Sequence, residues 1–231
     1  MKTIGLLGGM SWESTLSYYR LINEAVKAQL GGLNSAKLIL HSVNFADIEV
    51  LQRAGDWHQC GQILGEAAHG LELAGAQCIV ICTNTMHKVV EQITQHTSLP
   101  VLHVADVVAN ALKAQGIGCA ALLGTRFTMQ ESFYIERLQS HGLSVIVPSE
   151  IEQKAVDSII YQELCLGKIV PSSKAKYIEV INTLAQRGAR GVILGCTEIG
   201  LLIAQQDCVL PLFDTTYLHA QAVVNYAINS Q

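Results

Sequence analysis

The chain carries one short phrase twice, and this repetition restricts its fold more than any other feature of the sequence. Residues 80–85 read Val-Ile-Cys-Thr-Asn-Thr, and residues 193–198 read Ile-Leu-Gly-Cys-Thr-Glu. When the two are aligned at a constant offset of 113 residues (196 − 83), Thr83 falls opposite Cys196. Each copy is an apolar run that leads into a small polar turn. A chain with two such copies is expected to fold into two related halves, with one turn in each.

Two further matches support the same division. Residues 5–10 resemble residues 121–126 at an offset of 116 (121 − 5), and residues 99–102 resemble residues 210–213 at an offset of 111 (210 − 99). All three pairs occur in the same order along the chain and at nearly the same spacing. We interpret them as an internal duplication with a boundary near residues 105–117.

Short apolar runs alternate with segments of helical periodicity along the whole chain. Strands are predicted at 2–7, 37–43, 77–82, 100–103, 118–123, 143–147, 191–194 and 209–212, and helices at 14–30, 56–74, 85–95, 104–115, 128–140, 151–166, 173–187 and 215–228. Strands separated by helices form parallel sheets with helices on both faces, and continuous apolar runs are typical of such buried strands. We therefore predict an α/β fold with two similar, doubly wound parallel-sheet lobes related by pseudo-twofold symmetry. Ligands of open α/β sheets bind at the carboxyl ends of the strands, so the active site is expected in the cleft between the lobes.

The composition excludes several classes of protein. Half of the residues are hydrophobic, 15% are charged, and the formal net charge is −4 without any basic block, which argues against nucleic acid or an anionic membrane as partner. No apolar run reaches the ~18 residues of a membrane helix, and the first ten residues are better interpreted as a strand than as a signal peptide. The seven cysteines include no Cys-x-x-Cys pair. They are expected to be reduced thiols in a cytoplasmic protein, with no structural metal site.

The glycines of the first strand and its turn follow the pattern Gly-x-x-Gly-Gly, which is not the dinucleotide-binding fingerprint. They allow the backbone amides of Gly9, Met10 and Ser11 to bind a carboxylate near a helix start, although a tight turn without a ligand is the alternative. In the second half, Thr125 and Thr128 offer hydroxyls beside amides for a second anion. Helix capping by Thr128 is the alternative there.

Three motifs together resemble those of one enzyme family. Gly-Gly-Met-Ser at residues 8–11, Asn-Thr-Met-His at 84–87 and Gly-Cys-Thr-Glu at 195–198 look like the motifs of the aspartate/glutamate racemase family, and the resemblance covers essentially the whole chain. It implies a cofactor-independent amino-acid racemase with two α/β lobes, an inter-lobe active site and usually a homodimer. In this family the last helix packs on the first lobe. The predicted lobes are therefore 1–105 plus 213–231, and 106–212.

The resemblance also implies a catalytic pair with one unusual member. Inversion of an α-carbon requires one group to remove a hydrogen from one face and another to deliver a proton to the opposite face. Cysteine, with a pKa of ~8.5, suits both roles, and the family usually has it in both phrases. Here Cys196 is retained, whereas Thr83 stands at the first position. Cys82 is one residue too early, and neighbouring side chains on a strand point to opposite faces, so we do not expect it to substitute.

The role of Thr83 is open at this point. It is either a proton donor or a hydrogen-bonding wall, and removal of hydrogen from its side should be slow because an alcohol is a poor base. Other substrate-binding candidates implied by the resemblance are the hydrogen-bonding residues Asn84, Thr85 and Thr197, together with Met10, Ser11, Thr125 and Thr128 named above.

Charged residues near the phrases have two interpretations each. Arg53 is either a bidentate carboxylate clamp or a solvated arginine at a helix edge. Lys168 either approaches the cleft or lies at an exposed helix end. Glu198 orients neighbouring groups or the substrate amine, and His87 either is a satisfied helix residue or tunes the site.

The leading hypothesis is therefore an isomerase that racemises aspartate or glutamate without pyridoxal phosphate, using Cys196 and Thr83. No cofactor is implied, because no lysine lies in either phrase. A broad-specificity racemase for other polar amino acids, and a single-cysteine decarboxylase or isomerase of the same superfamily, are the alternatives. A third is a catalytically silent protein that binds a small acid.

Overall fold

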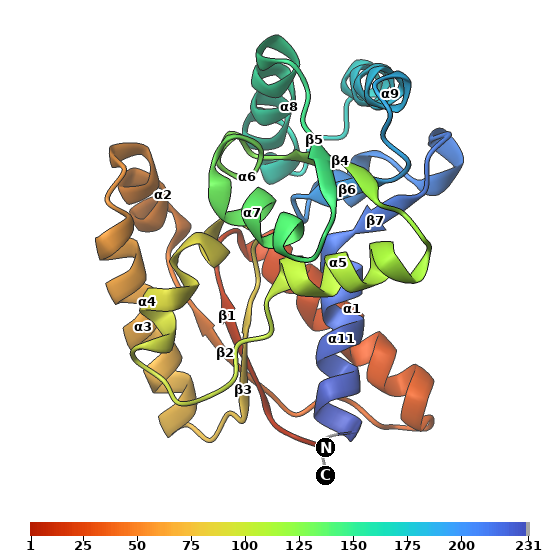
Figure 1. Cartoon of the computed structure of the whole chain (residues 1–231). Coiled ribbons are helices and arrows are strands. Elements are labelled where there is room, and N and C mark those ends of the chain that lie inside the picture. The colour runs from red at the N-terminus through yellow and green to blue at the C-terminus, as the bar shows by residue number, and fades with distance from the viewer. Residues whose placement is uncertain (230–231) are drawn as a thin grey trace. The chain divides into compact units, whose positions relative to one another are not determined.

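The computed structural model describes residues 1–229 of the chain (Figure 1). The chain divides into two compact units. One consists of Met1–His103 with the C-terminal segment that begins at His219, and the other consists of Val104–Leu218. Of the helices in the described part, none combines the length and apolar composition needed to cross a membrane.

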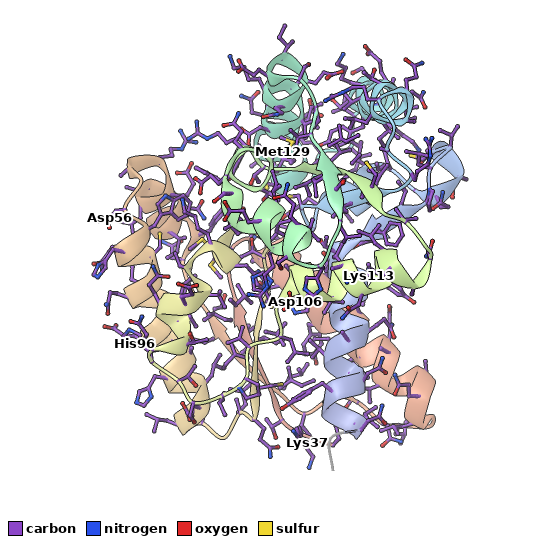
Figure 2. The ribbon with its side chains drawn as sticks, in the orientation of Figure 1. Lys37, Asp56, His96, Asp106, Lys113 and Met129 are labelled. Carbon is purple, nitrogen blue, oxygen red and sulfur yellow. The ribbon has the colours of Figure 1, made fainter. Side chains whose placement is uncertain are left out.

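The first unit is built on a sheet of parallel strands in the order β2-β1-β3. These strands are β1 (Ile4–Gly8), β2 (Leu38–Ser42) and β3 (Cys78–Ile81). Its helices are α1 (Trp12–Leu30), α2 (Phe45–Ala54), α3 (Trp57–Leu73), the 3-10 helix η1 (Thr85–Val89), α4 (Val90–Thr94) and the greater part of α11 (Thr215–Asn229). Glycines and polar caps separate them. Gly55 ends α2 in the left-handed conformation, and Asp56 (Figure 2) then caps α3 by accepting a hydrogen bond from the amide of Gln59 at 3.0 Å.

Helices cover both faces of this sheet. Ile4 and Leu6 of β1 pack with Tyr18 of α1 and with α11 on one face, whereas Leu7 packs with Leu64 of α3 on the other. All of these side chains are buried. This arrangement explains why the strand sequence is continuously apolar rather than alternating.

The second unit repeats this plan with one more strand, in the order β5-β4-β6-β7. The strands, all parallel, are β4 (Cys119–Gly124), β5 (Ser144–Ile146), β6 (Val192–Gly195) and β7 (Leu212–Asp214). The helices are α5 (Val104–Ala114), α6 (Arg126–Gln130), α7 (Ser132–Ser140), α8 (Glu150–Gln162), η2 (Leu164–Leu166), α9 (Pro171–Gln186), α10 (Ile199–Leu202) and η3 (Gln205–Asp207). One face of the sheet packs against α8 and α9, and the other packs against α5 and α7. The prediction of an α/β fold with two parallel sheets is confirmed.

Strand register reproduces the offsets found in the sequence. Gly5 of β1 pairs with Ile79 of β3, and the residues 116 and 113 positions later, Ala121 and Val192, pair in the same way. The next strand position agrees as well, because the amide of Ile79 donates to the carbonyl of Pro100 at 2.9 Å and that of Val192 donates to the carbonyl of Pro211 at 2.9 Å. Thr83 and Cys196 therefore occupy equivalent positions, each at the end of the corresponding strand of its own sheet.

Some predicted elements differ from the structure. The strand predicted at 100–103 is reduced to an isolated bridge between Ile79 and Val101. The helix predicted at 128–140 is two helices, α6 and α7, because Glu131 between them is extended. Helix α2, in which Ile48 and Gln52 are the buried residues, was not predicted.

Candidate active site

The turn after β3, which contains Thr83 and is called the first turn below, is hydrogen-bonded to α1. Ser14 donates to the carbonyl of Cys82 at 2.5 Å, and the amide of Cys82 donates to the carbonyl of Leu7 at 3.0 Å. Thr83 is half-buried, and its carbonyl accepts a hydrogen bond from Nδ1 of His87 at 2.9 Å. The predicted ligands Asn84 and Thr85 lie directly after it, where both are buried at the start of η1.

Cys82 lies in the core of the first unit rather than at the surface of this turn. Its side chain packs among residues of β1, α1 and α11 and is fully buried. Burial raises the pKa of the Cys82 thiol far above its usual range. A thiol in this environment is neutral and packs as a small hydrophobic group.

The glycine-rich turn after β1 is less open than the sequence suggested. The amide of Gly9 donates to Oγ1 of Thr15 at 2.8 Å, so the prediction that this amide is available to a carboxylate is wrong. Gly9 has a φ of 91°, and a Cβ there would collide with the backbone of Val43. Met10 and Ser11 are buried, and Ser11 caps α1 by accepting from the amide of Ser14 at 3.2 Å.

In the turn after β6, which contains Cys196 and is called the second turn below, a thiol is hydrogen-bonded to a buried carboxylate. Sγ of Cys196 donates to Oε2 of Glu198 at 2.9 Å, and Oγ1 of Thr197 donates to the same oxygen at 2.6 Å. Cys196 and Glu198 are 9% and 4% exposed. Burial, followed by the charge of Glu198, raises the pKa of the Cys196 thiol well above its usual range. The thiol is therefore protonated and donates a hydrogen bond to the Glu198 carboxylate.

Thr125 and Thr128 lie where β4 meets α6. Capping was predicted as the alternative role of Thr128, but the capping residue is Thr125, whose hydroxyl accepts from the amide of Thr128 at 3.4 Å. The two hydroxyls lie 3.2 Å apart, and both residues are buried. Thr128 also packs beneath the strand ends, because a Cβ on Gly124 or Gly195 would crowd its side chain.

The two predicted cationic ligands are on the surface. Nε of Arg53 forms an ion pair with the carboxylate of Glu49 one turn earlier on α2, and the Arg53 side chain is 71% exposed. Lys168 is exposed in the segment between η2 and α9. The structure of each unit therefore shows no contact of these two side chains with its own turn, and their roles as carboxylate ligands stay predictions.

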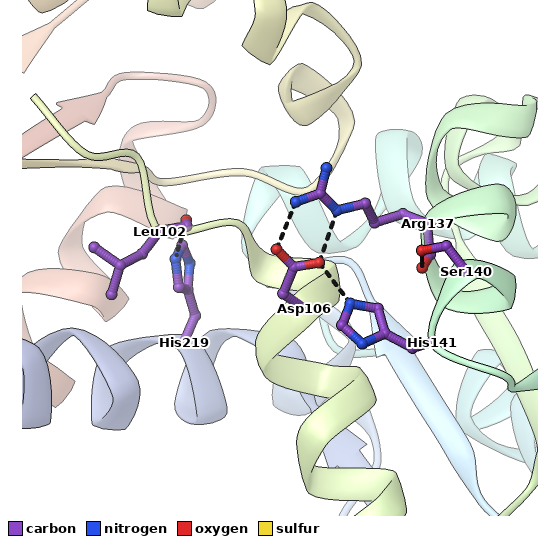
Figure 3. Close-up of polar contacts among 6 residues, drawn as sticks. All are labelled: Leu102, Asp106, Arg137, Ser140, His141 and His219. Atoms are coloured by element: carbon purple, nitrogen blue, oxygen red, sulfur yellow. Dashed lines mark hydrogen bonds and ion pairs between the residues drawn. The ribbon is translucent and has the colours of Figure 1, made fainter. Parts of the chain in front are cut away.

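Three buried polar residues beside the first turn, Gln52, His103 and His219, were not predicted as part of the site. Gln52 of α2 is 4% exposed, and its Nε2 donates to Sδ of Met86 in η1 at 2.9 Å. His103 and His219 lie near His87, and Nε2 of His219 donates to the carbonyl of Leu102 at 2.8 Å (Figure 3). No motif marks these residues, because they come together only through tertiary packing.

A separate polar cluster stabilises the second unit. Asp106 of α5 accepts hydrogen bonds from Nε and Nη2 of Arg137 at 2.7 and 2.6 Å, and Nε2 of His141 lies 2.9 Å from its Oδ1 (Figure 3). These bonds join α5 to the C-terminal end of α7. Within residues 1–229, no group of three His, Cys, Asp or Glu side chains is arranged to hold a metal ion.

Comparison with known proteins gives consistent matches. The family model described as Asp/Glu/Hydantoin racemase matches residues 7–223. The crystal structure of a putative Asp/Glu racemase from Yersinia pestis is 54% identical, covers 99% of this chain and 100% of its own, and superposes with a TM-score of 0.92. An aspartate racemase homologue from Pyrococcus horikoshii is 35% identical, with coverage of 98% and 99% and a TM-score of 0.86. The broad-specificity amino-acid racemase RacX of Bacillus subtilis is 24% identical over 96% of both chains.

Proposed function

The chain belongs to the Asp/Glu/hydantoin racemase family, and from this premise we propose that it racemises aspartate or glutamate by proton transfer between Cys196 and Thr83, without pyridoxal phosphate. One observation carries the proposal. The thiol of Cys196 donates to a buried carboxylate at the position that strand register makes equivalent to Thr83. A duplicated fold with a proton-transfer group at each equivalent position is what inversion of an α-carbon requires.

In the proposed reaction, Glu198 makes Cys196 a base. A thiol cannot remove a hydrogen until it has lost its own proton, and Oε2 of Glu198 lies 2.9 Å away to accept it. The thiolate then removes the α-hydrogen of one enantiomer, which we assign as the L form by analogy with the family.

Thr83 supplies the opposite face. Its hydroxyl delivers a proton to the enolate-like intermediate, with a water molecule as the most direct source of a replacement proton. An alcohol is a poor base, so hydrogen removal from this side is the slow direction. The two enantiomers have equal free energy, and kcat/KM must therefore be equal in both directions even when kcat and KM differ separately.

The remaining predicted ligands would bind the carboxylates and the ammonium group of the substrate whose α-carbon reacts with Cys196 and Thr83. Their hydroxyl, amide and charged groups suit two carboxylates and an ammonium, and hydrogen-bond donors near the developing negative charge lower the barrier. We assign this role to Met10, Ser11, Arg53, Asn84, Thr85, Thr125, Thr128, Lys168, Thr197 and Glu198. Arg53 would have to exchange its ion pair with Glu49 for a substrate carboxylate.

Similarity favours an acidic substrate. The Yersinia and Pyrococcus structures carry the names of Asp/Glu and aspartate racemases, and RacX has a broad specificity. We propose aspartate and glutamate first, and other polar amino acids second. We further propose a cytoplasmic homodimer, which the exposed apolar side chains Trp12, Leu16 and Tyr19 along α1 support.

A decarboxylase that delivers one proton with one thiol is the second candidate. It is favoured by a single observation, namely that Cys82 is buried in the core whereas the thiol of Cys196 donates to the carboxylate of Glu198. Such an enzyme would convert malonate-type acids and leave amino acids unchanged.

The test is α-proton exchange in deuterated water with a panel of L- and D-amino acids, aspartate and glutamate included, and with substituted malonates. We expect deuterium at the α-carbon and appearance of the opposite enantiomer for an acidic amino acid. Release of carbon dioxide from malonates alone supports the decarboxylase. Calorimetric binding of aspartate without any exchange supports the silent binding protein, and both results contradict the racemase.

A further inference from the structure

Three histidines are buried together beneath the first turn, within the first unit. His87 comes from η1, His103 from the segment that precedes α5, and His219 from α11, and they are 1%, 8% and 0% exposed. The ring centroids of His87 and His103 lie 4.6 Å apart, and those of His87 and His219 lie 5.8 Å apart. Buried imidazoles need defined hydrogen-bond partners, so the partners show what the cluster holds in place.

Hydrogen bonding fixes the tautomer of two of these rings. The carbonyl of Leu102 can only accept, so Nε2 of His219 carries its proton, and Nδ1 accepts from the hydroxyl of Tyr18 at 2.9 Å. The carbonyl of Thr83 likewise requires the proton of His87 to be on Nδ1. Burial and the neighbouring His87 lower the pKa of His219 to about 3, in agreement with a neutral ring.

The equivalent position of the second unit has no such side chain. The residue 113 positions after His87 is Gly200, where a Cβ would lie 2.7 Å from Oδ2 of Asp214. There the carbonyl of Cys196 accepts instead from the backbone amide of Ile199 at 3.2 Å. A side-chain donor thus holds the Thr83 carbonyl, whereas a backbone donor holds the Cys196 carbonyl.

We propose that His87 is a positioning residue for the Thr83 face. Its Nδ1–H fixes the Thr83 carbonyl, and thereby the direction of the Thr83 hydroxyl toward the α-carbon, while the Tyr18–His219 pair packs against the ring. The inference rests on the proposed racemisation and adds that proton delivery by Thr83 depends on the hydrogen bond from Nδ1–H of His87 to the Thr83 carbonyl. Displacement of a reacting group by ~1 Å can lower a rate ~100-fold, so a small rotation of this peptide is sufficient to matter.

The test separates the two faces of the reaction. L-aspartate or L-glutamate, whichever the wild type exchanges, is incubated in deuterated water, and two products are followed: L substrate that has gained deuterium, and D product. The Cys196 face alone makes the first, whereas the second also needs Thr83. For His87→Leu we expect the ratio of exchange to inversion to rise by ~10-fold or more. His87→Asn retains a neutral N–H donor and should recover part of the inversion, and His96→Leu, elsewhere in the first unit, is the matched control.

Each outcome decides the proposal. Equal loss of exchange and inversion in His87→Leu indicates a general structural role and overturns the inference, as does an unchanged ratio. A wild type without any exchange contradicts the proposed function itself, and the inference with it. Ring ¹⁵N NMR of the wild-type protein needs no variant, so it tests the inference even when a His87 variant does not fold. We expect His87 protonated on Nδ1 and His219 on Nε2, and a proton on Nε2 of His87 would overturn the inference.

Discussion

The Thr83 turn and the Cys196 turn have equivalent positions in their sheets but are held by different chemistry. Buried imidazoles lie beneath the first, and the carbonyl of Thr83 accepts a hydrogen bond from Nδ1 of His87. The second contains a buried carboxylate, Glu198, which accepts from both Cys196 and Thr197. The difference shows that duplication of a fold can preserve the position of a turn residue at a strand end without preserving the residue or its hydrogen-bond partners. The second turn has a thiol hydrogen-bonded to a carboxylate, and the first has an alcohol.

The largest effect is expected from removal of the only thiol that lies in either turn with a carboxylate partner. Cys196→Ala should lower α-proton exchange and inversion together by ~10³-fold, because general acid–base groups contribute on this scale. The measurement is deuterium incorporation and chiral analysis of the same samples. Cys208→Ala is the control and should keep the parental rates. Retained exchange in Cys196→Ala would assign the base elsewhere and remove the basis of the comparison.

Glu198→Gln should separate the reactivity of the thiol from catalysis. Loss of the negative charge lowers the pKa of Cys196 toward its usual range, because Glu198 is, after burial, the main cause of its increase. Alkylation of Cys196, followed by mass spectrometry at mildly alkaline pH, should therefore become faster, while racemisation falls ~100-fold for want of a proton acceptor. Glu163→Gln, at the junction of α8 and η2, is the control. If alkylation and racemisation change in the same direction, Glu198 does not accept the proton.

Thr83→Cys should make the two faces chemically alike. A thiol with a pKa of ~8.5 is a far better base than an alcohol, so kcat in the D-to-L direction is expected to rise ~10-fold. In both proteins kcat/KM must be equal for the two directions, which provides an internal check on the kinetics. Thr83→Ser keeps an alcohol and should behave like the parent. A Thr83→Cys variant that is no faster than Thr83→Ser would show that hydrogen removal at this face is not limited by basicity.

The two sheets and the paired turns could be predicted because their signals are local in the chain. The apolar runs predicted both parallel sheets, and the repeated phrase placed Thr83 and Cys196 at equivalent strand ends, as strand register confirms. Phrase and periodicity could not reveal the cluster of His87, His103 and His219, because its members lie up to 132 positions apart (219 − 87). The sequence pattern also could not show that the Gly9 amide donates to Oγ1 of Thr15, since this bond depends on how α1 packs against the turn that precedes it.

The last prediction concerns the pH dependence of stability, to which the buried His219 beneath the first turn should contribute. His219 has a pKa lowered from 6.5 to about 3, so the unfolded chain binds its proton more tightly than the folded one. Its contribution is complete above the unfolded pKa of 6.5 and is lost as the pH falls from there toward 3. The free energy of unfolding should fall by ~1 kcal/mol near pH ~5.5 and by a few kcal/mol at lower pH.

Urea unfolding of the wild type and of His219→Phe at a series of pH values measures this contribution. The variant loses the bonds to Tyr18 and to the Leu102 carbonyl, so it is less stable at neutral pH, but its stability should depend less on pH between ~4 and ~6.5. His58→Gln, an exposed histidine of α3, should leave the slope of the wild type unchanged. An equal acid slope in His219→Phe and in the wild type would mean that the proton-linked loss arises outside the histidine cluster.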